Sequence, residues 1–132
     1  MENAPKIRSF RDLHAWQNAH KVVLEIYKLT KKFPREELFG LSIQMRRAAV
    51  SITSNIAEGF SRTSNREKVQ FYSISQGSTS ELQNQLILAH DLGYIKSDLF
   101  NLVLAQTYDV SKIVNGLMRT ARTNTIYKIR NT

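Results

Sequence analysis

Few residues in this chain have the types and the spacing that catalysis or metal binding requires. Its three histidines are His14, His20 and His90, and the first two are six residues apart, which places them on different faces of a helix. No glutamate is followed by histidine at the Glu-x-x-His spacing of di-metal carboxylate bundles, and no HExxH motif occurs. Cysteine is absent, which excludes thiolate ligands and disulfides. The sequence therefore predicts no catalytic residue, no metal ligand and no cofactor, and an enzyme is the least favoured interpretation.

A set of polar residues does recur at helical spacing within residues 41–59. These residues lie three or four positions apart, beside an apolar face that contains Met45, Ile52 and Ile56. Polar groups next to a core are costly unless they bind one another, so we expect a buried network that joins this helix to a later one. The predicted network comprises Arg47, Ser51, Asn55, Glu58 and Glu81. A catalytic use of the same cluster is the weaker alternative.

The net charge is the second informative property. Nineteen Lys and Arg residues against eleven Asp and Glu residues give a formal charge of +8 and a pI near 10.0. A basic balance of this size favours an anionic partner, of which nucleic acid is the most common. A solvated surface that is merely basic is the alternative, and the positions of the charges have to distinguish the two.

Four helices are expected to position these residues. Helical periodicity is interrupted at Pro34, Gly59 and Gly93. Residues 122–132 do not continue the helical period and are predicted to form a basic tail. The short connections predict an all-α, antiparallel up-down-up-down four-helix bundle that forms a single domain over residues 1–132. The predicted helices span about residues 12–33, 38–58, 65–92 and 98–121, with Asp12 and Asn65 as N-caps of the first and third.

An up-down topology brings the chain start, the link between the second and third helices and the chain end to one end of the bundle. This end, the basic pole, has ten Lys and Arg residues against four Asp and Glu residues, whereas the opposite pole has five against four. A concentrated positive field suits a polyanion, and the chain has no recognition motif that would read bases in sequence, so we expect binding through phosphates. The predicted nucleic-acid-binding residues are Lys6, Arg8, Arg11, Arg62, Arg66, Lys68, Arg119, Arg122, Lys128 and Arg130.

The first helix is apolar on two sides. One seam, which includes Trp16, His20 and Val23, suits the bundle core, and a second stripe lies opposite to it. Surplus apolar surface usually marks an interface with a partner, so we expect a homo-oligomer. The predicted oligomer interface consists of Ala15, Val22, Ile26, Leu29 and Phe33 of the first helix and Ile43 and Val50 of the second.

The third helix contains a patch of small residues around Gly77. A glycine inside a helix costs roughly 1 kcal/mol relative to alanine. We therefore expect a neighbouring helix to approach closely at Gly77 in compensation.

Three blocks of the chain resemble one known family. They are FRDLHAWQNAHKVVLEIYKLTKKFP, RRAAVSITSNIAEG and GSTSELQNQLILAHDLGYI, in this order. They resemble the bacterial four-helix-bundle proteins encoded in intervening sequences of 23S ribosomal RNA genes. The resemblance implies a ring of five subunits. The family is also similar to accessory proteins of diversity-generating retroelements, which implies a reverse transcriptase as a further partner.

Two functions remain open at this stage. The favoured one is a non-enzymatic oligomeric bundle that binds RNA or an RNA–DNA hybrid through the basic pole. The alternative is a protein–protein scaffold with no direct nucleic-acid binding. No apolar run approaches 18 residues, so no membrane span is expected, and the lack of cysteine and of a secretory signal fits the cytoplasm.

Overall fold

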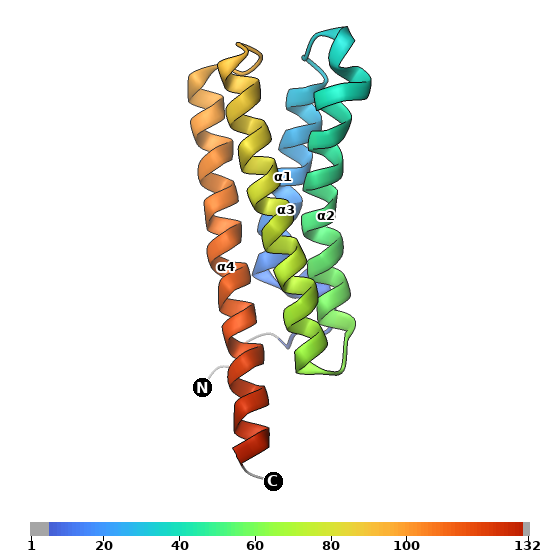
Figure 1. Ribbon diagram of the computed structural model, residues 1–132, viewed down its shortest axis with the longest axis vertical. Coiled ribbons are helices and arrows are strands. Elements are labelled where there is room, and N and C mark those ends of the chain that lie inside the picture. The colour runs from blue at the N-terminus through green and yellow to red at the C-terminus, as the bar shows by residue number, and fades with distance from the viewer. Residues whose placement is uncertain (1–5, 131–132) are drawn as a thin grey trace.

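The protein is an antiparallel four-helix bundle, as its helical periodicity predicts. The computed structural model describes residues 6–130, with the side chains of residues 6–124, and this part of the chain contains helices and no strand. α1 packs against α2 and α4, and α3 packs against the same two helices, so the order is up-down-up-down (Figure 1). The elements are η1 (Phe10–Asp12), α1 (His14–Thr30), η2 (Arg35–Glu37), the π-helical η3 (Leu38–Ser42), α2 (Ile43–Ser61), α3 (Asn65–Asp91) and α4 (Ser97–Arg130).

α1 begins at His14, later than predicted. Asp12, its predicted N-cap, instead takes part in capping the short 3₁₀ turn η1. Asp12 Oδ2 accepts hydrogen bonds from the backbone N–H groups of Arg8 at 2.8 Å and Ser9 at 3.1 Å. These two bonds hold the pKa of the Asp12 carboxyl below its usual value, because they favour the charged form. At α3 the cap is Ser64, whose Oγ accepts from the Glu67 N–H at 3.3 Å, one residue before the predicted Asn65.

The two glycines predicted to end helices have different roles. Gly93 has φ of +83° and ends α3, with the Tyr94 N–H bonded to the Ala89 carbonyl at 2.9 Å. Gly59 lies inside α2, which continues to Ser61, so the predicted stop at Gly59 is wrong. A Cβ at Gly59 would lie 2.7 Å from Tyr72 Cε1, so this glycine lets α2 and α3 pack closely.

Both apolar stripes of α1 contribute to the core: Val23 of the predicted core seam is buried, and Trp16 packs against the core at its edge. The stripe proposed as an oligomer interface is buried inside the single chain, where Ala15, Val22 and Ile26 are almost fully enclosed and Leu29 and Phe33 are also buried. Small and branched side chains on this stripe fit the narrow space between α2 and α4, whereas the larger Trp16 and His20 rings stack at the edge with centroids 4.6 Å apart. These five residues are therefore core, and they cannot form an exposed interface. On α2, Ile43 is half-buried and Val50 is exposed, and both border a surface groove.

The predicted basic tail is also corrected, because α4 continues through it to Arg130. No glycine or proline interrupts the sequence after Gly116, so nothing stops the helix where the apolar period weakens. The 34 residues of α4 span roughly 51 Å, and α4 extends past the ends of the other helices (Figure 1). Met118 and Ala121 are its last described buried residues.

Close packing of α3 on α2 comes from serines rather than from Gly77. Ser75 is fully buried, and its Oγ donates to the Ile52 carbonyl of α2 at 3.0 Å. The Ser78 and Ser51 hydroxyls are 2.7 Å apart. A Cβ at Gly77 would meet no atom within 4 Å, so the close approach predicted there is absent.

Candidate nucleic-acid interface

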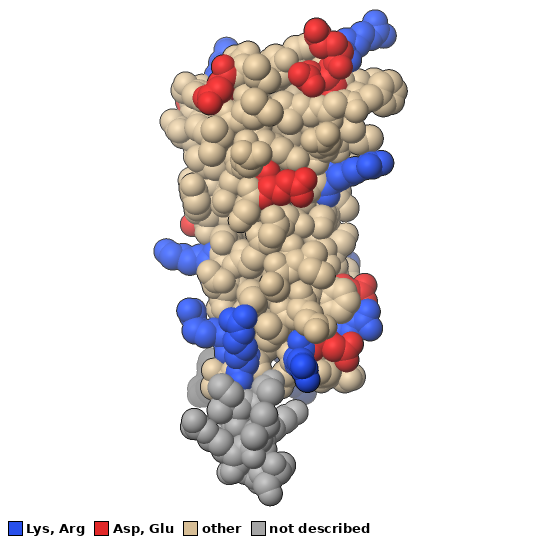
Figure 2. Space-filling model, viewed as in Figure 1, with Lys and Arg blue, Asp and Glu red and all other residues tan. Residues whose placement is uncertain are grey.

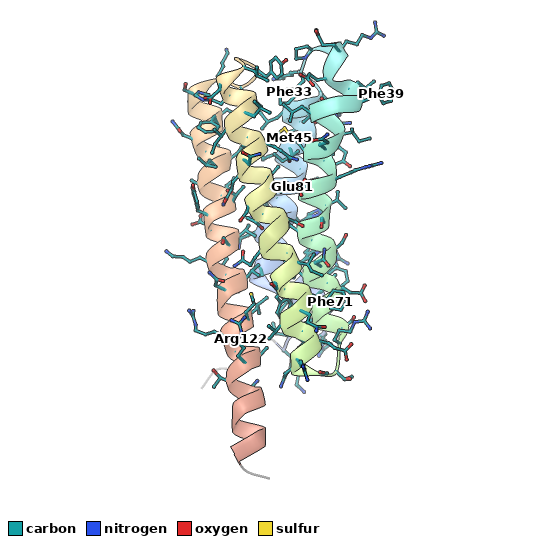
Figure 3. The ribbon with its side chains drawn as sticks, in the orientation of Figure 1. Phe33, Phe39, Met45, Phe71, Glu81 and Arg122 are labelled. Atoms are coloured by element: carbon teal, nitrogen blue, oxygen red, sulfur yellow. The ribbon has the colours of Figure 1, made fainter. Side chains whose placement is uncertain are left out.

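The basic pole predicted from topology exists in the structure. The first described residues, the α2–α3 link and the last turns of α4 lie at the same end of the bundle (Figure 1). Figure 2 shows Lys and Arg side chains clustered toward this end. Figure 3 places Arg122 and Phe71 there, and Phe33 and Phe39 at the opposite pole. The basic residues that the predicted topology assigns to this pole therefore also lie at one end of the structure.

Six basic side chains of this pole are exposed to solvent. They come from the segment before α1, the first turn of α3 and the last described turns of α4, so three segments of the chain share one surface. The exposed residues are Lys6, Arg8, Arg11, Arg66, Arg119 and Arg122. The side chains of Lys128 and Arg130 lie outside the described residues.

Lys68 and Arg62 are half-buried and bind groups within the protein. The Lys68 Nζ donates to the carbonyls of Gly59 at 3.2 Å and Phe60 at 2.7 Å, which caps the end of α2. Burial lowers the pKa of the Lys68 ammonium. Arg62 forms an ion pair with Glu58, and its guanidinium lies 4.8 Å from the centroid of the Phe71 ring. These two predicted binding residues therefore have structural roles that the other six lack.

A cavity of about 310 Å³ opens at the basic pole. Residues before α1, the end of α2, the start of α3 and α4 all contribute to its wall. Its lining is mostly apolar, with a few polar groups, and includes Phe60, Asn65, Lys68, Tyr72, Leu117 and Thr120. No sequence pattern indicates this cavity, because its residues come from four segments that only the fold brings together.

The opposite pole has nearly balanced charges, and some of its acidic groups are bound by the protein itself. The Glu37 carboxylate accepts from the Leu41 N–H at 3.2 Å and from the Tyr94 hydroxyl at 2.9 Å. The second bond is the main reason that the pKa of Tyr94 is raised. Tyr94 in turn packs against Phe33, with ring centroids 5.3 Å apart. This end of the bundle therefore has a much smaller net positive charge than the basic pole.

The predicted polar network of α2 is smaller than expected. Ser51, Asn55 and Ser78 are joined, since the Asn55 amide donates to the Ser51 Oγ at 3.1 Å and to its carbonyl at 2.8 Å. Arg47 and Glu81 are both exposed and do not pair, so they are not members of a buried cluster. The Glu81 carboxylate instead accepts from the Gln85 amide of the next turn at 3.3 Å. Glu58 is likewise exposed and pairs with Arg62.

A groove between α1 and α2 holds an arginine that the sequence analysis missed. Arg46 donates from Nε to the Thr30 Oγ1 at 2.8 Å, and its guanidinium lies 4.8 Å from the centroid of the Tyr27 ring. Arg47, Val50 and Ser51 also line this groove, which has a volume of about 470 Å³. One position along a helix turns a side chain by about 100°. The sequence therefore predicted the wrong arginine: Arg47 is exposed, and the neighbouring Arg46 is the one bound within the protein.

The described residues do not assemble a metal site. No group of three or more His, Asp or Glu residues within the described part of the chain could hold a metal ion. His90 Nε2 lies 3.0 Å from the Ser97 Oγ, and its ring stacks on Phe100 with centroids 4.2 Å apart. None of the helices in residues 6–130 is long and apolar enough to cross a bilayer.

Comparison with known proteins identifies a family and several related structures. The model of the family described as 23S rRNA-intervening sequence protein matches residues 11–116. The bundle is also similar to the 1.70 Å crystal structure of a protein with unknown function from the S23 ribosomal protein family of Bacteroides thetaiotaomicron VPI-5482. The TM-score is 0.74 at 20% sequence identity, covering 80% of this chain and 95% of that one, so the likeness concerns the fold. A comparison with curated proteins finds no match.

Proposed function

The chain belongs to the family of 23S rRNA-intervening sequence proteins, and on this premise we propose that it is a non-enzymatic bundle that binds RNA, or an RNA–DNA hybrid, through its basic pole. The observation that carries the proposal is the set of six exposed Lys and Arg side chains at one end of the molecule. Within the described residues that pole has eight basic against three acidic residues, an excess of five. The opposite pole has an excess of one.

The arrangement of these charges favours binding to a phosphate backbone. The exposed groups are long, flexible side chains spread over several segments, and residues 6–130 contain no strand that could enter a groove of a duplex. Such a surface neutralises phosphates and releases counterions without reading a sequence. Three exposed arginines, Arg66, Arg119 and Arg122, come from α3 and α4, which pack against each other.

Self-association is a second part of the proposal, on a surface different from the one first expected. Between Lys68 and Lys96 the chain has no Lys or Arg, and Ile74, Ile87 and Leu88 of α3 are exposed. A face without basic residues and with exposed apolar side chains suits contact between copies of the chain. A cyclic assembly, such as the ring of five implied by the resemblance, would repeat the basic pole around one axis and strengthen its field.

A protein–protein scaffold remains the second candidate, because one exposed aromatic residue favours it. Phe39, in the π-helical turn at the opposite pole, is 87% exposed (Figure 3). A large apolar side chain in solvent is typical of an anchor for a protein partner. A reverse transcriptase, as the resemblance implies, would be a partner of this class.

Salt-dependent binding to RNA tests the proposal directly. A labelled single-stranded RNA is titrated with the protein over a series of salt concentrations. Six phosphate contacts predict a slope of log K against log salt near −4, at about 0.7 per contact. No binding to RNA or hybrid at low salt would leave the scaffold as the better interpretation. Light scattering of the same samples measures the oligomeric state, and a monomer would remove self-association.

A further inference from the structure

Tyr72 forms part of the wall of the cavity at the basic pole. The residue as a whole is 4% exposed, and its hydroxyl makes no hydrogen bond with any described residue. The hydroxyl is not fully enclosed by the protein, so it can bind a ligand or a water molecule that enters the cavity. Burial raises the pKa of this hydroxyl, so it is neutral near pH 7 and can both donate and accept a hydrogen bond.

The position of Tyr72 is fixed by its packing. Gly59 leaves only enough room for the Tyr72 ring, whose Cε1 and Cδ1 atoms would lie 2.7 and 2.9 Å from a Cβ there. The nearby Lys68 ammonium is held by the carbonyls of Gly59 and Phe60. The floor of the cavity is therefore preorganised, and ligand binding does not have to order it.

The chemistry of the wall fits a ligand that has both apolar surface and hydrogen-bonding groups. Phe60 and Leu117 supply apolar surface, whereas Asn65 and Thr120 supply hydrogen-bonding groups. The volume of about 310 Å³ lies at the small end of the range for ligand pockets, roughly 300–1,000 Å³. Exposed arginines Arg8, Arg66 and Arg122 directly follow the lining residues Ile7, Asn65 and Ala121 in the chain, so a ligand that carries phosphates is favoured over an uncharged one.

We propose that this cavity takes one unstacked base of an RNA strand whose phosphates lie on the surrounding arginines. The proposal rests on the proposed function and narrows its substrate to single-stranded RNA. A paired base is held inside a duplex by stacking and pairing, so it cannot enter the cavity without being extruded. An unpaired base enters with no such cost, and its contact with the cavity wall adds to the affinity that the phosphate contacts provide.

The experiment compares three probes of equal length in the presence of the intact protein. They are a short single-stranded RNA, the duplex formed from that strand, and the same strand with abasic positions. Base–aromatic contacts predict that the abasic strand binds about fivefold more weakly or worse. The duplex should also bind more weakly, although it carries more phosphates.

Two variants test the cavity itself. Thr120 is exposed on the cavity wall, so Thr120→Trp should block the cavity without disturbing the core, and the exposed Thr123→Trp on the same helix is the matched control. Tyr72→Phe removes only the hydroxyl and should weaken single-strand binding by about two- to tenfold, whereas the exposed Tyr108→Phe should not. In the Thr120→Trp protein the difference between the normal and the abasic strand should disappear while the salt slope stays the same.

The possible failures are distinct. Equal affinity of the wild-type protein for the normal strand, the abasic strand and the duplex, with the salt slope retained, would overturn the cavity proposal and leave backbone binding intact. An unchanged preference in Thr120→Trp would also overturn it. Failure to bind any of the three probes at low salt would overturn the proposed function and this proposal together.

Discussion

At the basic pole most arginines extend into solvent, whereas at the opposite pole the carboxylate of Glu37 is bound by a backbone amide and by the Tyr94 hydroxyl. The described part of the basic pole has three acidic residues and the opposite pole has four, but they have eight and five basic residues, so the net charge of the two ends differs. A charged group that is already paired within the fold adds little to a field outside it. The comparison shows that the net charge of a surface has to be considered together with the exposure and pairing of its charged side chains.

Reversing two exposed charges of the basic pole should have the largest effect. Arg66→Glu with Arg122→Glu removes two phosphate contacts and adds repulsion, so RNA affinity should fall on the order of tenfold or more and the salt slope should decrease by about 1.4. A glutamate in the first turn of α3 is favourable to the helix, so the variant should fold. The matched control is Lys31→Glu with Lys32→Glu at the opposite pole. Equal losses in the two double variants, measured by fluorescence anisotropy, would break the distinction between the poles.

The second prediction concerns the packing that holds the basic pole together. Gly59→Ala would place a Cβ against the Tyr72 ring and should destabilise the protein by about 1–3 kcal/mol. Gly77→Ala is the control, because open space surrounds that position and alanine is the better helix former, so stability should rise by roughly 1 kcal/mol. Urea unfolding measures both, and a stabilised Gly59→Ala protein would show that α2 and α3 are not in close contact there.

The third prediction separates structural from binding charges within the basic pole. Lys68→Met loses the two hydrogen bonds to the end of α2 and should cost about 1 kcal/mol of unfolding free energy, with little change in the RNA salt slope. Arg66→Met should do the reverse, leaving stability unchanged and lowering the slope by about 0.7. If Lys68→Met reduced the slope as much as Arg66→Met does, Lys68 would have to be counted as a phosphate ligand.

The smallest effects are expected along the exposed side of α2 and α3. Arg47→Ala and Glu81→Ala remove exposed, unpaired charges, so each should change stability by no more than about 0.5 kcal/mol. Ser75→Ala, a few residues away, removes a buried hydrogen bond and should cost about 1 kcal/mol. Thermal unfolding of the three variants compares them. A loss of several kcal/mol from Arg47→Ala would restore the buried network that the sequence suggested.

The number of helices, their order and the position of the basic pole could be predicted, because they depend on periodicity and on short links. The inward face of α1 could not be predicted, because its two apolar stripes have similar hydrophobicity. Which stripe is buried more deeply depends on the shape of the space between α2 and α4. Ala15 and Val22 fit that space and Trp16 does not. The bound arginine was likewise predicted one helical position away from its true place, at Arg47 instead of Arg46. The cavity around Tyr72 was beyond prediction, because it depends on contacts among segments distant in sequence.

The pattern of helix packing also has a consequence for how the chain folds. Each of α1, α2 and α3 packs on the helix that follows it, and among the described residues the main contact between the two ends of the chain is that of α1 with α4. Bundles with contacts so local in sequence have low contact order and fold in microseconds to milliseconds. The α1–α4 contact closes the longest loop, so we expect it to form last. The cavity at the basic pole, which requires both the segment before α1 and the end of α4, would then be completed only in the final step of folding.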